Sequence, residues 1–179
     1  MNYQLFALVN GWAGRWDGLD DAMEFAATGL IYLIFAVSAG LVATALYRRR
    51  LRPVVELGVA LVLAFAGAQL LAHLSNEVRP FQSHQVHQLI AHEPGVSLPS
   101  DHATAAFALA FGVYAFLSRR WGIVLGVLAL AVGSSRVWVG VHYPGDILAA
   151  AAIAGLAVLE VSMCSRWARA RNRAVEGVL

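Results

Sequence analysis

Long apolar stretches separated by short polar connections are the feature that most constrains how this chain can fold. About 20 mostly apolar residues are needed for a helix to cross a bilayer core of about 30 Å. Since a helix satisfies its own backbone hydrogen bonds, such stretches predict a helical bundle within the membrane. Five stretches meet the requirement, at residues 22–47, 54–75, 100–118, 121–140 and 144–166.

Composition supports the membrane class over the soluble one. Only 13% of the 179 residues are charged, 59% are hydrophobic and the mean hydropathy is +0.64, whereas about a quarter of residues are charged in typical soluble domains. Cys164 is the sole cysteine, so no intrachain disulfide can form. We therefore expect a single all-α, membrane-embedded domain over residues 1–179, without internal repeats.

The N-terminal stretch, residues 3–13, is too short and too polar to span a bilayer. It also lacks the basic start and long apolar run of a signal peptide. We expect it to form a short helix at the membrane interface, with a sixth span as the alternative. A polar, turn-like segment over residues 15–21 should follow.

The placement of arginine predicts the orientation of the bundle. All thirteen basic residues are arginines, and residues 48–52, 119–120 and 166–173 hold ten of them. These segments share one end of a five-span bundle, so the positive-inside rule makes that end and the C-terminus cytoplasmic. No basic arm with interleaved aromatic residues indicates nucleic-acid binding.

Residues suited to phosphate chemistry lie at the opposite end of the bundle. Ser100 has the character of a helix N-cap, with Asp101 in the first turn. The backbone N–H groups of Asp101 and His102 would then be available to an anion such as phosphate. His102 can also give or take a proton near neutral pH.

Two further segments reach the same membrane depth. Arg79 follows the second apolar stretch, and Arg136 ends the fourth; each guanidinium can grip two phosphate oxygens. Asp146 lies four residues after His142 and can hold one ring nitrogen, which makes the other more basic. His142 is thus the candidate nucleophile and His102 the candidate acid, although spacing alone does not say which histidine attacks.

These motifs resemble those of a known family, over roughly residues 55–165. Pro99-Ser100-x-His102 and Ser135-Arg136-x5-His142-x3-Asp146 are similar to the second and third signatures of the type 2 phosphatidic acid phosphatases, and Arg79-Pro80 to the end of the first. Gly-Val-His-Tyr-Pro-Gly-Asp is most similar to the bacterial undecaprenyl-diphosphatase (bacitracin-resistance) branch. The resemblance implies that His142 forms a phosphoenzyme and that His102 protonates the leaving group, with no metal or other cofactor.

One departure from the family pattern needs its own interpretation. The lysine of the first signature falls at Ala72. In a continuous helix, Ala72, Asn76 and Arg79 would share a face by their i, i+4, i+7 spacing. We therefore expect Asn76 to donate to a phosphate oxygen where the family uses lysine.

Each of these residues also has an ordinary structural interpretation. Ser100 and Asp146 can simply cap helices, and Arg79 can anchor a span at the interface. The joint pattern is more specific, because all the residues fall at one depth. The histidines of the connection 81–98 are expected on the loop surface, where they could line an entrance, rather than as metal ligands; they are His84, His87 and His92.

We therefore expect a lipid phosphatase of the bacterial plasma membrane, with its active site on the outer face. The expected reaction converts undecaprenyl diphosphate to the monophosphate and phosphate, so the partners are a lipid phosphate and membrane lipids. The sequence carries no signal for an oligomeric state. Alternatives are a phosphatidylglycerophosphate or phosphatidic acid phosphatase with the same site, and a non-enzymatic protein that binds or transports lipid phosphates. A serine protease is disfavoured, because no Gly-x-Ser-x-Gly elbow is present.

Overall fold

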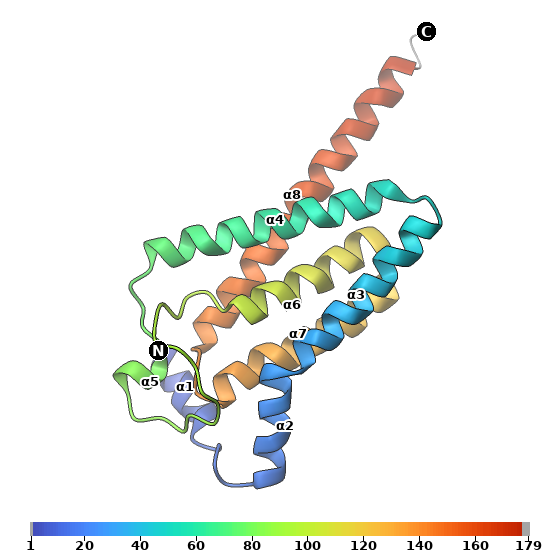
Figure 1. The fold of residues 1–179 in the computed structure, drawn as a ribbon. Helices are drawn as coiled ribbons and strands as arrows, with labels where there is room; N and C mark the ends of the chain where they lie inside the picture. The colour runs from blue at the N-terminus through green and yellow to red at the C-terminus, as the bar shows by residue number, and fades with distance from the viewer. Residues whose placement is uncertain (1, 177–179) are drawn as a thin grey trace.

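The computed structural model describes residues 2–176, and this part of the chain is helical, without a β-sheet (Figure 1). One isolated antiparallel bridge joins Val78 and Val96. In chain order the helices are α1 (Asn2–Asn10), α2 (Asp17–Thr28), α3 (Leu30–Tyr47), α4 (Leu51–Leu74), α5 (Pro80–Ser83), α6 (Asp101–Gly112) with a π-helical turn (Val113–Leu117), α7 (Arg119–Trp138) and α8 (Pro144–Glu176).

Helix α6 is the centre of the bundle. Nine of its twelve residues are buried, most of them alanine, and it packs against α4, α7 and α8. Small side chains let neighbouring helices approach closely, which is how helices associate within a membrane. The core around α6 is formed by small and branched apolar residues that include Ala64, Ala106, Ala110, Leu125, Ala129, Val132, Ala150 and Ala154.

The predicted membrane bundle is confirmed. Four helices, α3, α4, α7 and α8, are long and apolar enough to cross a membrane. The fifth predicted span is the shorter apolar helix Asp101–Leu117. Its seventeen residues extend about 25 Å at about 1.5 Å per residue, and its neighbours cover it.

The first predicted span differs from the structure. Residues 22–47 do not form one helix, because the chain bends at Gly29 between α2 and α3 (Figure 1). Glycine is a poor helix former, so a bend at this position costs little free energy. The prediction of a turn-like segment over 15–21 is also wrong from Asp17 onward, where α2 begins with Asp17 and Asp20 in its first turn. Acidic side chains there are favoured by the helix dipole.

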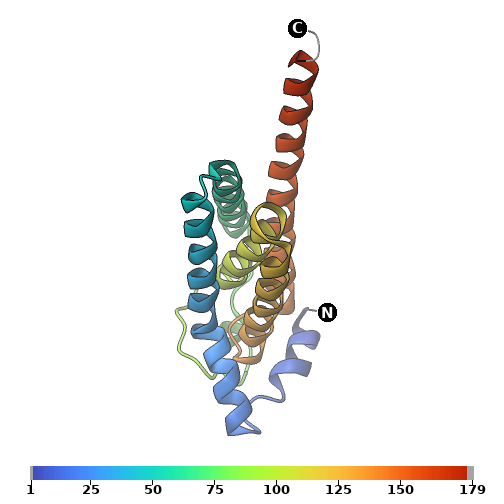
Figure 2. The same cartoon turned by 90° about the vertical axis from the view of Figure 1, so that its right-hand side faces the viewer.

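Helix α8 continues beyond its predicted end near Arg166. It runs to Glu176, and its last turns extend past the other helices (Figure 2). Alanine and arginine, which dominate this stretch, are good helix formers, and no glycine or proline interrupts it before Gly177. The predicted short N-terminal helix is present as α1.

The start of α7 packs tightly against the π-helical turn, and this contact yields a prediction. A Cβ atom at Gly122 would overlap the backbone of Tyr114, whereas a Cβ at Gly126 would meet nothing within 4 Å. We expect Gly122→Ala to lower the free energy of unfolding by about 1–3 kcal/mol, as overpacking does. Thermal unfolding in detergent measures this. Gly126→Ala is the matched control and should be neutral or slightly stabilising; equal effects of the two changes would contradict the contact.

Candidate active site

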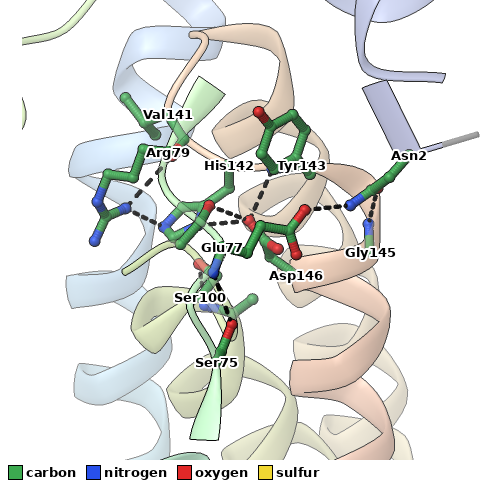
Figure 3. Close-up of polar contacts among 12 residues, drawn as sticks. Asn2, Ser75, Glu77, Arg79, Ser100, Val141, His142, Tyr143, Gly145 and Asp146 are labelled. Atoms are coloured by element: carbon green, nitrogen blue, oxygen red, sulfur yellow. Dashed lines mark hydrogen bonds and ion pairs between the residues drawn. The ribbon is translucent and has the colours of Figure 1, made fainter. Parts of the chain in front are cut away.

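Three segments distant in sequence meet at the end of the bundle where α4 stops and α8 begins (Figure 3). The first is the extended chain between α4 and α5, which carries Arg79. The second is the start of α6, and the third is the junction of α7 and α8. Their contacts join Arg79, Ser100, His142 and Asp146.

His142 and Asp146 form a buried pair. The side chain of His142 is 2% exposed and that of Asp146 is 0% exposed. His142 Nδ1 donates to Asp146 Oδ2 at 3.1 Å, so Nδ1 carries the proton and Nε2 keeps its lone pair. Burial lowers the pKa of His142 to about 4, since the charged form loses its hydration; the hydrogen bond to Asp146 opposes this, and the charges of Arg136 and Arg79 add to it. His142 is therefore a neutral imidazole near pH 7.

Arg79 lies directly against the lone pair of His142. Its Nη1 donates to His142 Nε2 at 2.9 Å and to the carbonyl of Val141 at 3.4 Å (Figure 3). Burial lowers the pKa of Arg79 from its usual value, while the carboxylates of Asp101 and Asp146 favour its charged form. The guanidinium is therefore placed to bind an anion that approaches Nε2.

Arg136 occupies the last turn of α7 and is 2% exposed. Its Nη1 donates to the carbonyl of Ala27 at 3.2 Å. Its Nε and Nη2 are buried and, within the described chain, have no acceptor; the same holds for Nε of Arg79. Buried donors without acceptors are costly, by about 1–3 kcal/mol each. Both guanidiniums thus keep donors that an anion would satisfy.

The start of α6 has the predicted cap. Ser100 is the N-cap, and its Oγ accepts from the backbone N–H of Ala103 at 3.5 Å. The backbone N–H groups of Asp101 and His102 have no acceptor among the described residues, as expected for a first helical turn. His102 is half-buried and lies close enough to Arg79 and Arg136 for their positive charges to act on its ring. The structure therefore gathers all the predicted site residues except Asn76.

The helical face predicted for Ala72, Asn76 and Arg79 is wrong. Helix α4 ends at Leu74, and Ser75 already has an extended backbone (φ −94°, ψ 140°). Asn76 is exposed in this extended segment. A phosphate contact from Asn76 stays a prediction, now without the helical spacing that supported it.

Two contributors to the cluster were not found from the sequence. Ser97 is fully buried, and its hydroxyl donates to Asp146 Oδ2. His92, expected on the loop surface, is half-buried with its ring centroid 6.1 Å from that of His142. Burial lowers the pKa of His92, and the charges of Arg79 and Arg136 act in the same direction. The expectation of a surface position holds for His84 and His87, which are exposed.

Helix α1 holds the segments around the cluster in place. Asn2 donates to the carboxylate of Glu77 at 3.0 Å and accepts from the backbone N–H of Gly145 at 2.9 Å (Figure 3). Asn10 is buried and bonds the backbone of His87 and Trp138 with three hydrogen bonds of 2.7–2.9 Å. These contacts hold the loop above the site and the α7–α8 junction in fixed positions.

The described residues contain no group of three or more His, Cys, Asp or Glu side chains able to hold a metal ion. The side chains that the structure gathers here are His92, His102, His142, Asp146 and the two arginines. A neutral imidazole oriented by a carboxylate can attack phosphorus, and the arginines can bind the phosphate oxygens. Together with the bundle, this cluster defines the class of membrane-embedded phosphatases.

Comparison with known proteins places the chain within this class. The chain belongs to the PAP2 superfamily, whose sequence model matches residues 53–171. The resemblance drawn from the three motifs is therefore confirmed.

Among relatives, undecaprenyl-diphosphatase BcrC of Bacillus subtilis is 34% identical over 86% of this chain and 79% of the relative. The bacitracin transport permease protein BcrC of Bacillus licheniformis is 33% identical over 90% of this chain and 79% of the relative. Among solved structures, Aquifex aeolicus LpxE aligns with a TM-score of 0.73 at 25% identity, over 89% of this chain and 93% of the other.

The lowered pKa of His142 predicts how stability depends on pH. An unfolded histidine binds a proton below about pH 6.5, whereas folded His142 does so only below about pH 4. Above about pH 6.5 the imidazole is neutral in both states; as the pH falls from about 6.5 to about 4, the unfolded chain binds a proton that folded His142 does not, and the free energy of unfolding decreases. We expect the midpoint of thermal unfolding in detergent to fall between pH 7 and pH 4.5.

His142→Gln should remove part of this fall, because glutamine does not titrate. His84→Gln, which removes an exposed histidine, is the control and should keep the wild-type pH dependence. An unchanged pH dependence in His142→Gln would show that other groups cause it.

Proposed function

We propose that this protein hydrolyses a polyprenyl diphosphate, undecaprenyl diphosphate, to the monophosphate and phosphate through a phosphohistidine. The observation that carries the proposal is the contact of Arg79 Nη1 with His142 Nε2 at 2.9 Å, while Asp146 holds the opposite ring nitrogen. Through this contact, the guanidinium of Arg79, which can bind phosphate, lies next to the lone pair of His142 Nε2, which can act as a nucleophile. The relative from Bacillus subtilis, named an undecaprenyl-diphosphatase, supports the choice of substrate.

Binding of the terminal phosphate prepares the nucleophile. The N–H of Arg79 that points at Nε2 turns to a phosphate oxygen, which frees the lone pair of His142 beside the phosphorus atom. Arg136 offers its two unpaired nitrogens to the other oxygens, and the first N–H groups of α6 add neutral donors. Ser100 fixes that helix start as its N-cap. With alanine at position 72, the two arginines supply the positive charge.

In the first chemical step, His142 Nε2 forms a bond to the terminal phosphorus, and the bond from phosphorus to the bridging oxygen breaks. The electron pair of that bond goes to the leaving lipid monophosphate, and protonated His102 supplies a proton to the leaving oxygen. The imidazole becomes cationic, and the buried carboxylate of Asp146, bonded to Nδ1, stabilises that charge.

In the second step, water attacks the phosphohistidine. Its proton goes to His102, which became neutral in the first step. The bond between phosphorus and Nε2 breaks, inorganic phosphate is released, and His142 returns to its neutral form. His102 thus acts first as acid and then as base, and each cycle restores both histidines.

The substrate would reach the site from the outer leaflet. Its headgroup lies at the membrane surface while its chain stays in the bilayer, which matches a site at the ends of spanning helices. Ten arginines lie at the other end of the bundle, and this asymmetry supports a cytoplasmic C-terminus and an outward-facing site in a bacterial plasma membrane.

The relative from Bacillus licheniformis bears the name of a transport permease, which favours a second candidate function. In that case the arginines would bind a lipid phosphate without cleaving it. The same residues would also serve a phosphatase of phosphatidylglycerophosphate or phosphatidic acid. Turnover of a lipid phosphate would distinguish a phosphatase from a protein that only binds or transports the lipid. The relative rates on different lipid phosphates would then show which phosphatase it is.

The covalent step gives the central prediction. Purified protein, without added metal, should release phosphate fastest from undecaprenyl diphosphate within a panel that includes phosphatidylglycerophosphate and phosphatidic acid. His142→Ala should abolish release, by at least about 1,000-fold, because the nucleophile is lost. Denaturation during turnover of substrate labelled in its terminal phosphate should trap protein-bound label that survives base and is lost in mild acid, as a phosphoramidate does.

His73→Ala, which changes an exposed histidine of α4, is the matched control and should keep wild-type turnover. Full activity of the His142→Ala protein would exclude the proposed nucleophile. Tight binding of the lipid with no turnover by the wild type would instead support the binding protein.

The orientation gives a second prediction. In a Cys164→Ser background, a cysteine at the exposed position Gln85 should react with a membrane-impermeant thiol reagent in intact cells. A cysteine at the exposed position Leu51 should react only after lysis, and this change leaves every arginine in place. The reverse pattern of labelling would place the site on the cytoplasmic face.

A further inference from the structure

The end of the bundle opposite the catalytic cluster contains a basic pocket that the proposed reaction does not use. It lies between the start of α4, the π-helical turn and α8, and has a volume of 360 Å³. Tyr114, Ala115 and Phe116 of the π-helical turn form part of its wall. Five arginines line it, namely Arg50, Arg52, Arg119, Arg166 and Arg169.

Within residues 2–176, most of this positive charge is not paired with a carboxylate. The carboxylate of Glu56 accepts from Arg52 Nε at 2.8 Å and from the hydroxyl of Ser165 at 2.7 Å, and Arg52 also donates to the carbonyl of Ser165. The described carboxylates form no ion pair with the other four arginines. Glu56, the one acidic residue that lines the pocket, is thus already bonded to Arg52 and Ser165. The other four guanidiniums are therefore available to bind an anion.

An apolar groove continues from the basic pocket along α6 and α8. It has a volume of 310 Å³ and shares four lining residues with the pocket, so the two are continuous. The remainder of its lining is apolar, with Phe111, Gly155, Val158, Leu159 and Met163. This groove lies on the surface that faces the lipid chains, because α8 is one of the spanning helices.

Pocket and groove together match one kind of molecule. A phosphodiester headgroup can accept charge-assisted hydrogen bonds from several guanidiniums, and an acyl chain fits an apolar groove within the bilayer. A soluble anion would use only the pocket. Arginines that only set the orientation of the protein in the membrane need not line a common cavity. Arg171 and Arg173, for example, lie on the same helix but outside the pocket.

We propose that this pocket binds the headgroup of an anionic phospholipid, with one acyl chain of that lipid in the groove between α6 and α8. Basic pockets between spanning helices on the cytoplasmic side bind such headgroups in other membrane proteins. The site is separate from the catalytic cluster, so it stands whether or not the proposed substrate is correct.

Native mass spectrometry of the full chain with added lipids tests the proposal. Dioleoylphosphatidylglycerol should form a saturable one-to-one adduct, and zwitterionic dioleoylphosphatidylcholine should bind about tenfold more weakly or less. The double change Arg166→Gln with Arg169→Gln should weaken the anionic adduct by about tenfold, since two headgroup contacts are lost. The matched control, Arg171→Gln with Arg173→Gln, removes the same charge from the same helix and should leave the affinity within about twofold of wild type.

A second variant tests the groove. A Cβ at Gly155 would lie 3.8 Å from the ring of Phe111, an ordinary contact, and Gly155 lines the groove, so we expect a leucine there to occupy it. Gly155→Leu should weaken binding of the dioleoyl lipid and leave competition by glycerol phosphate unchanged, whereas Gly155→Ala should bind as wild type. Unfolding temperatures and phosphatase activity should stay unchanged in all these variants, which shows that they fold.

Three results would overturn the proposal. Equal weakening by the two arginine pairs would indicate attraction by net charge without a site. Equal binding of the two lipids would exclude selection of an anionic headgroup. Full displacement of the lipid by inorganic phosphate, with no effect of Gly155→Leu, would assign the pocket to a soluble anion.

Discussion

The buried carboxylate of Asp146 is the group on which the rest of the candidate site depends. Its Oδ2 accepts from the backbone of Tyr143 at 2.8 Å, from His142 Nδ1 and from the hydroxyl of Ser97, and its carbonyl faces the backbone N–H of Ser100 at 3.5 Å. A buried charge without such partners would cost several kcal/mol. The first turn of α8, where the helix dipole favours an anion, lowers that cost further. Asp146 thus orients the ring of His142 through its carboxylate and contacts the start of α6 through its backbone carbonyl.

The two ends of the bundle use arginine in opposite ways. At the end with the candidate site, Arg136 is almost fully buried and Arg79 is half-buried. Because the dielectric constant is low there, each of these guanidiniums would attract an anion strongly. At the other end, many exposed arginines share one pocket, where each interaction is weaker and the sum matters. The first arrangement suits selective binding of phosphate oxygens during a reaction, and the second suits retention of a lipid headgroup that is not transformed.

Much of the fold, and the clustering of most candidate site residues, could be predicted from the sequence, because both rest on local patterns. Apolar length gave the spanning helices, and the N-cap pattern gave the start of α6 at Ser100. The failures have two causes. Asn76 was assigned by helical spacing, but α4 ends at Leu74; His73 in the last turn and Asn76 just beyond it are residue types typical of a helix end, and the spacing argument left them out. The other cause is contact between distant segments. The hydrogen bond from Ser97 to Asp146 spans 49 residues, and a serine in a polar loop carries no signal for it.

The contacts of the N-terminal helices with the candidate site could not be predicted from the sequence either, because they also join distant segments. The motifs lie within residues 53–171, yet the carbonyl that accepts from Arg136 belongs to Ala27, at the end of α2. Trp138 is held by Asp20 through its ring nitrogen at 2.7 Å and by Asn10 through its carbonyl. Some of the residues that hold the candidate site therefore lie outside the part of the chain that carries the motifs. Since Arg136 and Trp138 lie on the last turn of α7 and both contact α2, a shift of α2 would move the guanidinium of Arg136 directly, without any change in the motifs.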